Sequence, residues 1–408
     1  MTTQEPADFP LEVVRAREVA LRLLKDLPPA GPPRTDVEGR GLMLSSRTSA
    51  SRRLPPYYLV YFLLVDLLGY PRMGLGEKSA WTVPVRYQDR VYGIEHRKFG
   101  LGIFAPNLDP NARMSGTPNA QAEEDACAIA DLVTQAVSAA EPYFRWRAEQ
   151  AVSTPNLSVI NKSDSLFARY QYFHDRFQYL SVEAELRKDE TVVDESIFPD
   201  GSVLTRTSFP GFVLQQEADW NAQAAIEAFF SWTEHVFIHI AILLGKLRSG
   251  DEVARLADSD WKAKFKAALD IVDVQTKAHY DNLLDLRAQV RNFMAHGSFG
   301  KRGEAFTFHS GAGAVPVVLT EDQRHKFSLT GRIAFDEKTA IAGIESFLEH
   351  LWSGDRAPLR LHVFSGLPSI LTHALDGTYK NALQSEEAMN DFVIHLHRAF
   401  DRAADMDW

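Results

Sequence analysis

Long helical patterns from residue 157 onward constrain the fold more than any other feature of this sequence. Apolar residues recur there at three- and four-residue spacing, which is the period of an amphipathic helix. The predicted helices of this part are 157–188, 217–248, 259–271, 275–296, 336–352 and 385–404. Short strands are expected between them at 305–309, 315–319 and 327–335, and the turn-rich stretch 191–212 predicts a hairpin.

The first 153 residues combine helices with strands. Helices are predicted at 11–26, 57–69 and 120–149, and strands at 81–87, 90–96 and 100–104. Thr154-Pro155 provides a boundary. The fold class is therefore mainly α, with an N-terminal α+β domain and short β insertions. We expect three regions: an N-terminal domain at 1–153, a helical domain at 154–355 and a C-terminal helical extension at 356–408.

Composition and charge narrow the class of protein. A chain of 408 residues with 45% apolar and 24% charged residues has the composition of a folded protein. One cysteine, Cys127, excludes an intramolecular disulfide and a multi-cysteine zinc site. Residues 1–10 have no apolar signal segment, and the apolar run 57–69 is too short to cross a bilayer. We therefore expect a cytoplasmic protein with no membrane contact.

The charges are unevenly distributed along the chain. The formal net charge of -10 argues against a protein that coats nucleic acid without specificity, because an acidic surface repels phosphates. Residues 246–302, however, contain eleven Lys and Arg against eight Asp and Glu. A local excess of positive charge in an acidic chain is compatible with a confined phosphate-binding site, although the charge count alone favours a solvated helix face of mixed charge.

The predicted helix 275–296 carries the polar cluster of greatest interest. Leu283, Leu286, Val290 and Phe293/Met294 form its apolar stripe. Residues four positions apart lie on the same face of a helix. The polar side chains that share faces in this way near its end are Arg287 with Arg291 and Asn292 with His296. Gly297, which follows, is favoured just beyond a helix end. Two guanidiniums, an amide and an imidazole are thus gathered near one helix terminus.

This run, Arg291-Asn292-Phe293-Met294-Ala295-His296, resembles the active-site motif of HEPN ribonucleases, in which an Arg and a polar residue precede a His at the end of a helix. Asn directly after the Arg is the variant associated with nuclease-active members. The resemblance covers about residues 155–355 and implies a HEPN-like helical bundle. It also implies a homodimer in which two copies of the motif meet in one cleft.

The chemistry of RNA cleavage requires residues of these types. A His with a pKa near neutrality can transfer the protons of the 2′-hydroxyl and the leaving oxygen, which is the role expected of His296. Arg291 would stabilise the phosphorane through its guanidinium, and Asn292 would orient His296 or hold the scissile phosphate. Arg287, Lys301 and Arg302 are candidate contacts for substrate phosphates. No metal or cofactor is required.

A pair of histidines on the predicted helix 217–248 gives a competing signal. His235 and His239 are four residues apart, a spacing that can hold a metal ion, but no third ligand is evident. The preferred interpretation is that Glu234 or His235 supports the ribonuclease cleft.

A second competing site lies in the N-terminal part. Asp89 and Glu95 suggest a metal-dependent nuclease, although Lys98 is one position late and strand alternation puts it on the face opposite Glu95.

Three functions follow, in order of preference. The first is a metal-independent endoribonuclease that cleaves RNA by 2′-hydroxyl attack and acts as a toxin or antiviral defence effector. Residues 1–153 would then be a sensor or recognition module on which an antitoxin or an activating trigger acts. The second is a non-catalytic HEPN module for RNA binding or dimerisation. The third is the metal-dependent nuclease that uses Asp89 and Glu95.

Overall fold

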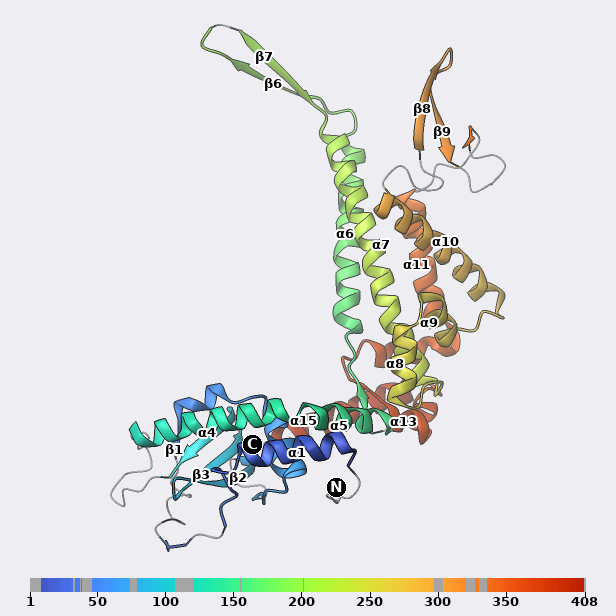
Figure 1. Cartoon of the computed structure of the whole chain (residues 1–408). Helices are drawn as coiled ribbons and strands as arrows, with labels where there is room; N and C mark the ends of the chain where they lie inside the picture. Colours follow the sequence, from blue (N-terminus) through green and yellow to red (C-terminus); the bar gives the residue numbers. More distant parts are fainter. Residues whose placement is uncertain are drawn as a thin grey trace. The chain divides into compact units, whose positions relative to one another are not determined.

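The computed structural model is mainly helical and divides into two compact units (Figure 1). It describes residues 9–31, 34–36, 38, 46–73, 79–106, 120–154, 156–200, 202–296, 304–319, 327–329 and 336–406, without the side chains of 291–296, 304–305, 316, 318–319, 328 and 403–406. One unit comprises Met1–Ser153 together with Arg398–Trp408, and the other comprises Thr154–His397. Residues 356–397, expected in a separate extension, are part of the second unit.

The first unit combines helices with an antiparallel sheet of strand order β1-β4-β3-β2. Its elements are α1 (Leu11–Leu23), β1 (Ser46–Arg47), η2 (Ser49–Arg53), α3 (Tyr57–Tyr61), η3 (Phe62–Leu67), β2 (Ser79–Tyr87), β3 (Arg90–Arg97), β4 (Gly100–Ala105), α4 (Ala120–Ala139) and α5 (Glu141–Ser153). The three predicted strands are confirmed as β2, β3 and β4. A single helix over 120–149 is wrong, because Pro142 lacks an N–H and a new helix begins just before it.

The core of this unit is built from one face of each helix and from the sheet. Val13 and Ala20 of α1, Ile129 and Val133 of α4, and Tyr92 of β3 are among its fully buried residues. The spacing of the buried residues in α1 and α4 is the helical pattern from which these helices were predicted. Strand β3 is buried on both faces, because residues 91–95 are all buried.

The second unit is assembled around one long buried helix, α7 (Pro210–Leu243). Its other helices are α6 (Ser163–Leu186), α8 (Gly250–Asp258), α9 (Trp261–Ala268), α10 (Val274–His296), α11 (Glu337–Leu351), η5 (Gly354–Arg356), α12 (Ala357–Val363), α13 (Leu371–Leu375) and α14 (Thr378–Ala382). Helix α15 (Glu386–Met406) begins in this unit, and its residues from Arg398 onward belong to the first unit. Helices α6, α9, α11 and α12 pack against α7. Trp232, Phe237 and Ile240 of α7 are completely buried in the core that they form.

Three small sheets complete the second unit. Strand β5 (Ser158–Val159) pairs with β11 (Ser369–Ile370), β6 (Val192–Ile197) with β7 (Val203–Ser208), and β8 (Glu304–Ser310) with β9 (Gly313–Leu319), which also pairs with β10 (Phe327–Ser328). The predicted hairpin within 191–212 is thus confirmed. Helices α6 and α7 lie side by side and lead into this hairpin (Figure 1).

Helix α7 has a composition that matters for the expected location of the protein. In the part of the chain that the structure describes, it is the one helix long and apolar enough to cross a membrane. Of its most apolar window, 72% is buried inside the unit, as in the core helix of a folded domain.

Candidate active site

Helix α10 presents the predicted site at its C-terminal end. It spans Val274–His296, so the backbone is helical through the whole run from Arg291 to His296. Leu283 and Val290 are buried in the core and Leu286 packs against it, which confirms the predicted apolar stripe over these turns. The side chains of Arg291, Asn292 and His296 lie outside the description, as do Lys301 and Arg302 entirely. The motif therefore forms the last turns of α10, and the helical backbone continues to His296.

Arg287, one turn before Arg291, is held in an ion-pair cluster. Its Nη2 donates to Glu234 Oε1 of α7 at 2.6 Å, and Lys264 Nζ of α9 donates to the other oxygen, Oε2, at 2.9 Å. The guanidinium carbon of Arg287 also lies 5.9 Å from the ring centroid of Phe230 and 5.8 Å from that of Trp261. One carboxylate thus connects α7, α9 and α10 beside the motif.

This cluster lies at the margin of the core. The Lys264 side chain is 6% exposed, whereas those of Glu234 and Arg287 are 35% and 37% exposed. Lys264 is therefore a nearly buried charge whose partner is Glu234. Of the two supporting candidates, Glu234 is the one that contacts Arg287.

His235, the neighbour of Glu234, belongs to a different network. Its Nε2 accepts a hydrogen bond from the backbone N–H of Lys162 at 2.9 Å, and its ring centroid lies 4.5 Å from that of His239. Burial, and to a smaller extent the charge of Lys162, lower the pKa of His235. Glu234 and His235 are neighbours in the sequence, but their side chains contact different parts of the unit.

The histidine pair of α7 is part of a buried hydrogen-bond network. His239 Nδ1 lies 2.8 Å from Ser369 Oγ of β11, and Ser369 Oγ lies 3.5 Å from His362 Nε2 of α12. Burial lowers the pKa of His239 to about 3 and that of His362 to about 4, so both imidazoles are neutral at physiological pH. Within the described residues no group of three or more His, Cys, Asp or Glu is placed to hold a metal ion.

The two carboxylates of the alternative N-terminal site, Asp89 and Glu95, lie near opposite ends of strand β3. Asp89 lies in the two-residue turn before β3 with φ +61°, its side chain 92% exposed and 3.6 Å from Arg34 Nη1. Glu95 is buried near the other end of the strand, where its Oε2 lies 2.6 Å from Arg97 Nη2, and burial is the main cause that raises its pKa. Asp89 and Glu95 are six positions apart, which corresponds to about 20 Å between their Cα atoms along an extended strand. They are too far apart to share one metal ion.

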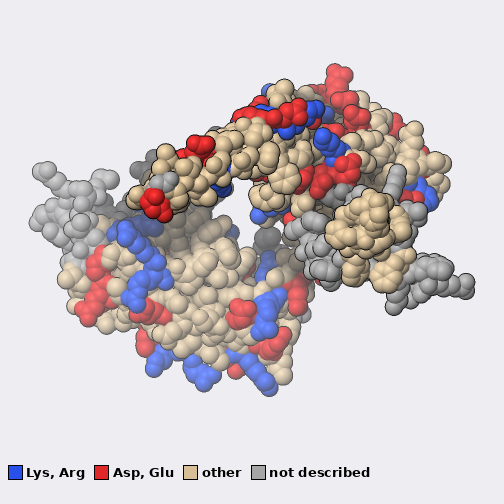
Figure 2. Space-filling model, turned by 90° about the horizontal axis from the view of Figure 1, so that it is seen from above, with Lys and Arg blue, Asp and Glu red and all other residues tan. Residues whose placement is uncertain are grey.

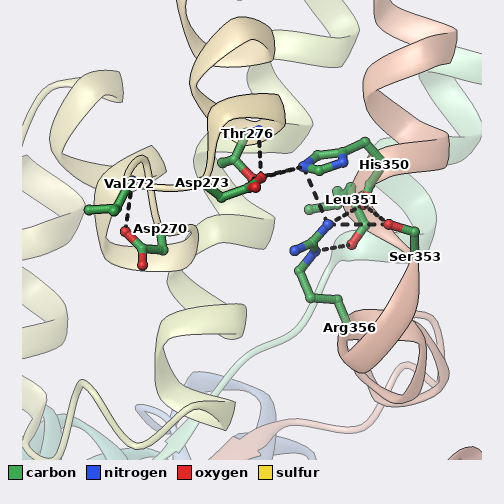
Figure 3. Close-up of polar contacts among 8 residues, drawn as sticks. All are labelled: Asp270, Val272, Asp273, Thr276, His350, Leu351, Ser353 and Arg356. Carbon is green, nitrogen blue, oxygen red and sulfur yellow. Dashed lines mark hydrogen bonds and ion pairs between the residues drawn. The ribbon is translucent and has the colours of Figure 1, made fainter.

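A second polar cluster, which the sequence did not indicate, joins the start of α10 to the end of α11 (Figure 3). Thr276 Oγ1 lies 2.7 Å from Asp273 Oδ2 and 2.8 Å from His350 Nε2. Asp273 also accepts the backbone N–H of Thr276 at 2.8 Å, and Arg356 Nη2 donates to the His350 carbonyl at 2.6 Å. These bonds satisfy backbone groups at the two helix ends.

A hollow of about 460 Å³ lies beside this cluster, with His279, Glu349 and His350 in its lining. The rings of His279 and His350 stack with centroids 4.8 Å apart. Burial, then the charge of Arg356 and the neighbouring His279, lower the pKa of His350, while Asp273 opposes the shift. The residues of this cluster come from positions more than 70 apart in the sequence, so no local pattern could have revealed it.

The charged side chains of the described residues are mixed in sign on the face seen in Figure 2. Lys and Arg are interspersed with Asp and Glu on this face (Figure 2). A mixed distribution of this kind is expected for a chain of formal charge -10. No protein-family model, curated protein or solved structure matches this chain.

Proposed function

We propose that this protein is a metal-independent endoribonuclease with a HEPN-type active site formed by Arg291, Asn292 and His296. The observation that carries the proposal is the position of this motif. It forms the end of helix α10, whose preceding turns are fixed by core packing and by the Arg287 to Glu234 ion pair. A helix backbone held in this way gives the residues of its last turns a regular spacing, and acid-base chemistry depends on such positioning.

The residues of the motif account for each step of cleavage. His296 takes the proton of the RNA 2′-hydroxyl or delivers one to the leaving 5′-oxygen. The 2′-oxygen forms a bond to phosphorus as the bond to the 5′-oxygen breaks, which gives a 2′,3′-cyclic phosphate and a 5′-hydroxyl. Arg291 stabilises the negative charge of the phosphorane, and Asn292 orients the imidazole or the phosphate. The negative end of the helix dipole favours the protonated form of His296.

Three further cations would bind the phosphates that flank the scissile bond. A guanidinium has five N–H donors, so the bond of Arg287 to Glu234 leaves donors with which Arg287 can contact a phosphate. Lys301 and Arg302 follow the motif in the sequence within ten residues. These contacts make binding salt-dependent.

The active unit in this proposal is a homodimer around α10, because one motif supplies a single imidazole and the reaction needs both an acid and a base. Residues 1–153 would form the module on which a trigger or an antitoxin acts. The biological role proposed is that of a cytoplasmic toxin or antiviral defence effector. The related possibility, a HEPN module that binds RNA or dimerises without cleaving, uses the same residues and predicts binding without products.

The decisive experiment is an RNA-cleavage assay in excess EDTA. We expect cleavage with a 2′,3′-cyclic phosphate product, and a loss of roughly 10²-fold or more in the His296→Ala protein. The matched control is His279→Ala, which changes a histidine of the same helix away from the motif and should leave cleavage unchanged. An unchanged rate in His296→Ala would refute the catalytic assignment. Activity that required a metal would refute the mechanism.

A further inference from the structure

Three aromatic side chains are exposed on the small sheet that follows α10 in the chain. Phe306 and Phe308 of β8 are 49% and 43% exposed, and Phe327 of β10 is 58% exposed. The rings of Phe306 and Phe327 are in edge-to-face contact with centroids 5.9 Å apart. They come from different strands, so the sheet itself brings them together.

Strand register places all three phenylalanines on one face of this sheet. Phe306 is opposite Val317, Phe308 is opposite Val315, and Phe327 is opposite Leu319. Directly opposed residues of antiparallel strands share a face, and alternate residues of one strand do as well. The face is therefore apolar and aromatic, yet its rings are about half accessible to solvent.

An exposed face of this kind indicates a binding surface. A small sheet normally gains its stability by burying its apolar face, and adjacent exposed apolar side chains mark sites of interaction. The three phenylalanines are absent from the buried core of the second unit. Their exposure therefore has no explanation in the packing of the described part of the chain.

The spacing and the charge of this region favour unpaired nucleic-acid bases as the occupant. Residues two apart on a strand are separated by about 6.6 Å, close to twice the 3.4 Å rise between stacked bases. Residues 297–329 contain four Lys and Arg against three Asp and Glu, in a chain of formal charge -10. Two of the four, Lys301 and Arg302, precede β8, and Lys326 is bonded directly to Phe327. Proteins that bind single-stranded nucleic acid combine aromatic rings, on which bases stack, with nearby cations.

We infer that Phe306, Phe308 and Phe327 form a stacking platform for single-stranded RNA, which holds unpaired bases beside the site at the end of α10. The identity of the occupant rests on the proposed ribonuclease function. Phe306 lies ten positions after His296, so the chain restricts its Cα atom to within about 36 Å of the motif. The platform selects unpaired RNA, because bases within a duplex do not present their faces.

The platform is tested by RNA binding in the His296→Ala protein, which should not cleave the probe, with EDTA present to inhibit contaminating metal-dependent nucleases. The probe is a fluorescent, uridine-rich RNA without secondary structure, and the readout is anisotropy. Stacking contributes about 1–3 kcal/mol per base, so Phe306→Ala should weaken binding by about 5- to 150-fold. Phe308→Ala should have a similar effect, whereas Phe306→Tyr should retain the affinity. A duplex RNA should bind more weakly than the single strand.

The control variant is Phe212→Ala, which removes a 72% exposed phenylalanine of α7 in the same unit and should leave RNA binding unchanged. Thermal unfolding of each variant confirms that the fold persists. Phenylalanine-dependent binding by a wild-type protein that cleaves no RNA would support the platform and refute the enzyme. Cleavage by the wild type with unaffected binding in the Phe306 and Phe308 variants would refute the platform alone. Loss of self-association with unchanged RNA binding would refute it in favour of a protein contact.

Discussion

The second unit contains histidines in two contrasting regions, the core around α7 and the end of α10. His239 and His362 flank Ser369 in the core, where burial lowers their pKa to about 3 and about 4. His296, the proposed catalytic histidine, is instead the last residue of helix α10. A general acid or base needs a pKa near the working pH and access to substrate, and the core pair has neither. In the proposed function, environment rather than helical spacing distinguishes the catalytic histidine from the structural ones.

The largest expected effect comes from the phosphate-stabilising residue at the end of α10. Arg291→Ala should reduce RNA cleavage by roughly 10²-fold or more, because the phosphorane loses its charged donor. Arg291→Lys should also fail, since an ammonium cannot reproduce the bidentate fork. Both should fold normally and, if the wild-type protein is toxic, should accumulate without toxicity. Full activity of Arg291→Lys would show that only a charge is needed.

The buried histidines His239 and His362 should lower the stability of the fold in acid and have no effect on RNA cleavage. The unfolded chain takes up protons near pH 6.5, whereas folded His239 and His362 resist protonation until about pH 3 and about pH 4. Stability present above pH 6.5 is therefore lost as the pH falls, by about 1.4 kcal/mol per pH unit for each imidazole. Urea unfolding at pH 7.5 and 5.5 measures this. His239→Gln should remove its share of the slope while RNA cleavage persists, and an unaltered slope would contradict the assignment.

The ion-pair cluster of Glu234, Lys264 and Arg287 should contribute a smaller amount to the free energy of unfolding. Glu234→Ala leaves the Lys264 ammonium, whose side chain is 6% exposed, without its carboxylate. Because Glu234 is itself 35% exposed, we expect a loss of about 2 kcal/mol, below the range for fully buried pairs. Urea unfolding gives the value. The double variant Glu234→Ala/Lys264→Met should recover most of it, and a failure to recover would point to Arg287 as the destabilised partner.

The smallest effect is expected at the start of α10. Thr276→Val keeps the shape of a buried side chain and removes its hydroxyl contacts with Asp273 and His350. A loss of about 1 kcal/mol is expected from these hydrogen bonds. RNA cleavage should be retained, because the change is about 30 Å along the helix from His296. Impaired cleavage with unchanged stability would show that the two ends of α10 are coupled.

Local patterns in the sequence predicted much of this fold. The helix expected at 275–296 is α10 at Val274–His296, and its apolar spacing is sufficient to locate it. Helix α8 was missed, although Ser249 accepts the backbone N–H of Glu252, a capping pattern visible in the sequence. Helix α7 begins at Pro210, seven residues before its predicted start, and proline is favoured in a first helical turn. In both cases the missed signal lies at the start of a helix, where single capping or first-turn residues determine where the helix begins.

The arrangement around the candidate site could not be predicted in this way. Glu234, Lys264 and Arg287 come from three helices, and their pairing depends on how α9 and α10 pack on α7. The same limit applies to His350 and Thr276, which are 74 residues apart. The phenylalanines of β8 were within a predicted strand, but their exposure depends on what covers the sheet. Sequence pattern thus located the motif, and tertiary packing determined its surroundings.

The paired helices α6 and α7, with the β6–β7 hairpin at their far end, also have a practical consequence. Residues of both strands are mostly exposed, and the turn that joins them carries no part of the proposed chemistry. Exposed loop tips of this kind tolerate insertions. A fluorescent protein or an affinity tag inserted into this turn should therefore report the location and assembly of the full-length chain in cells.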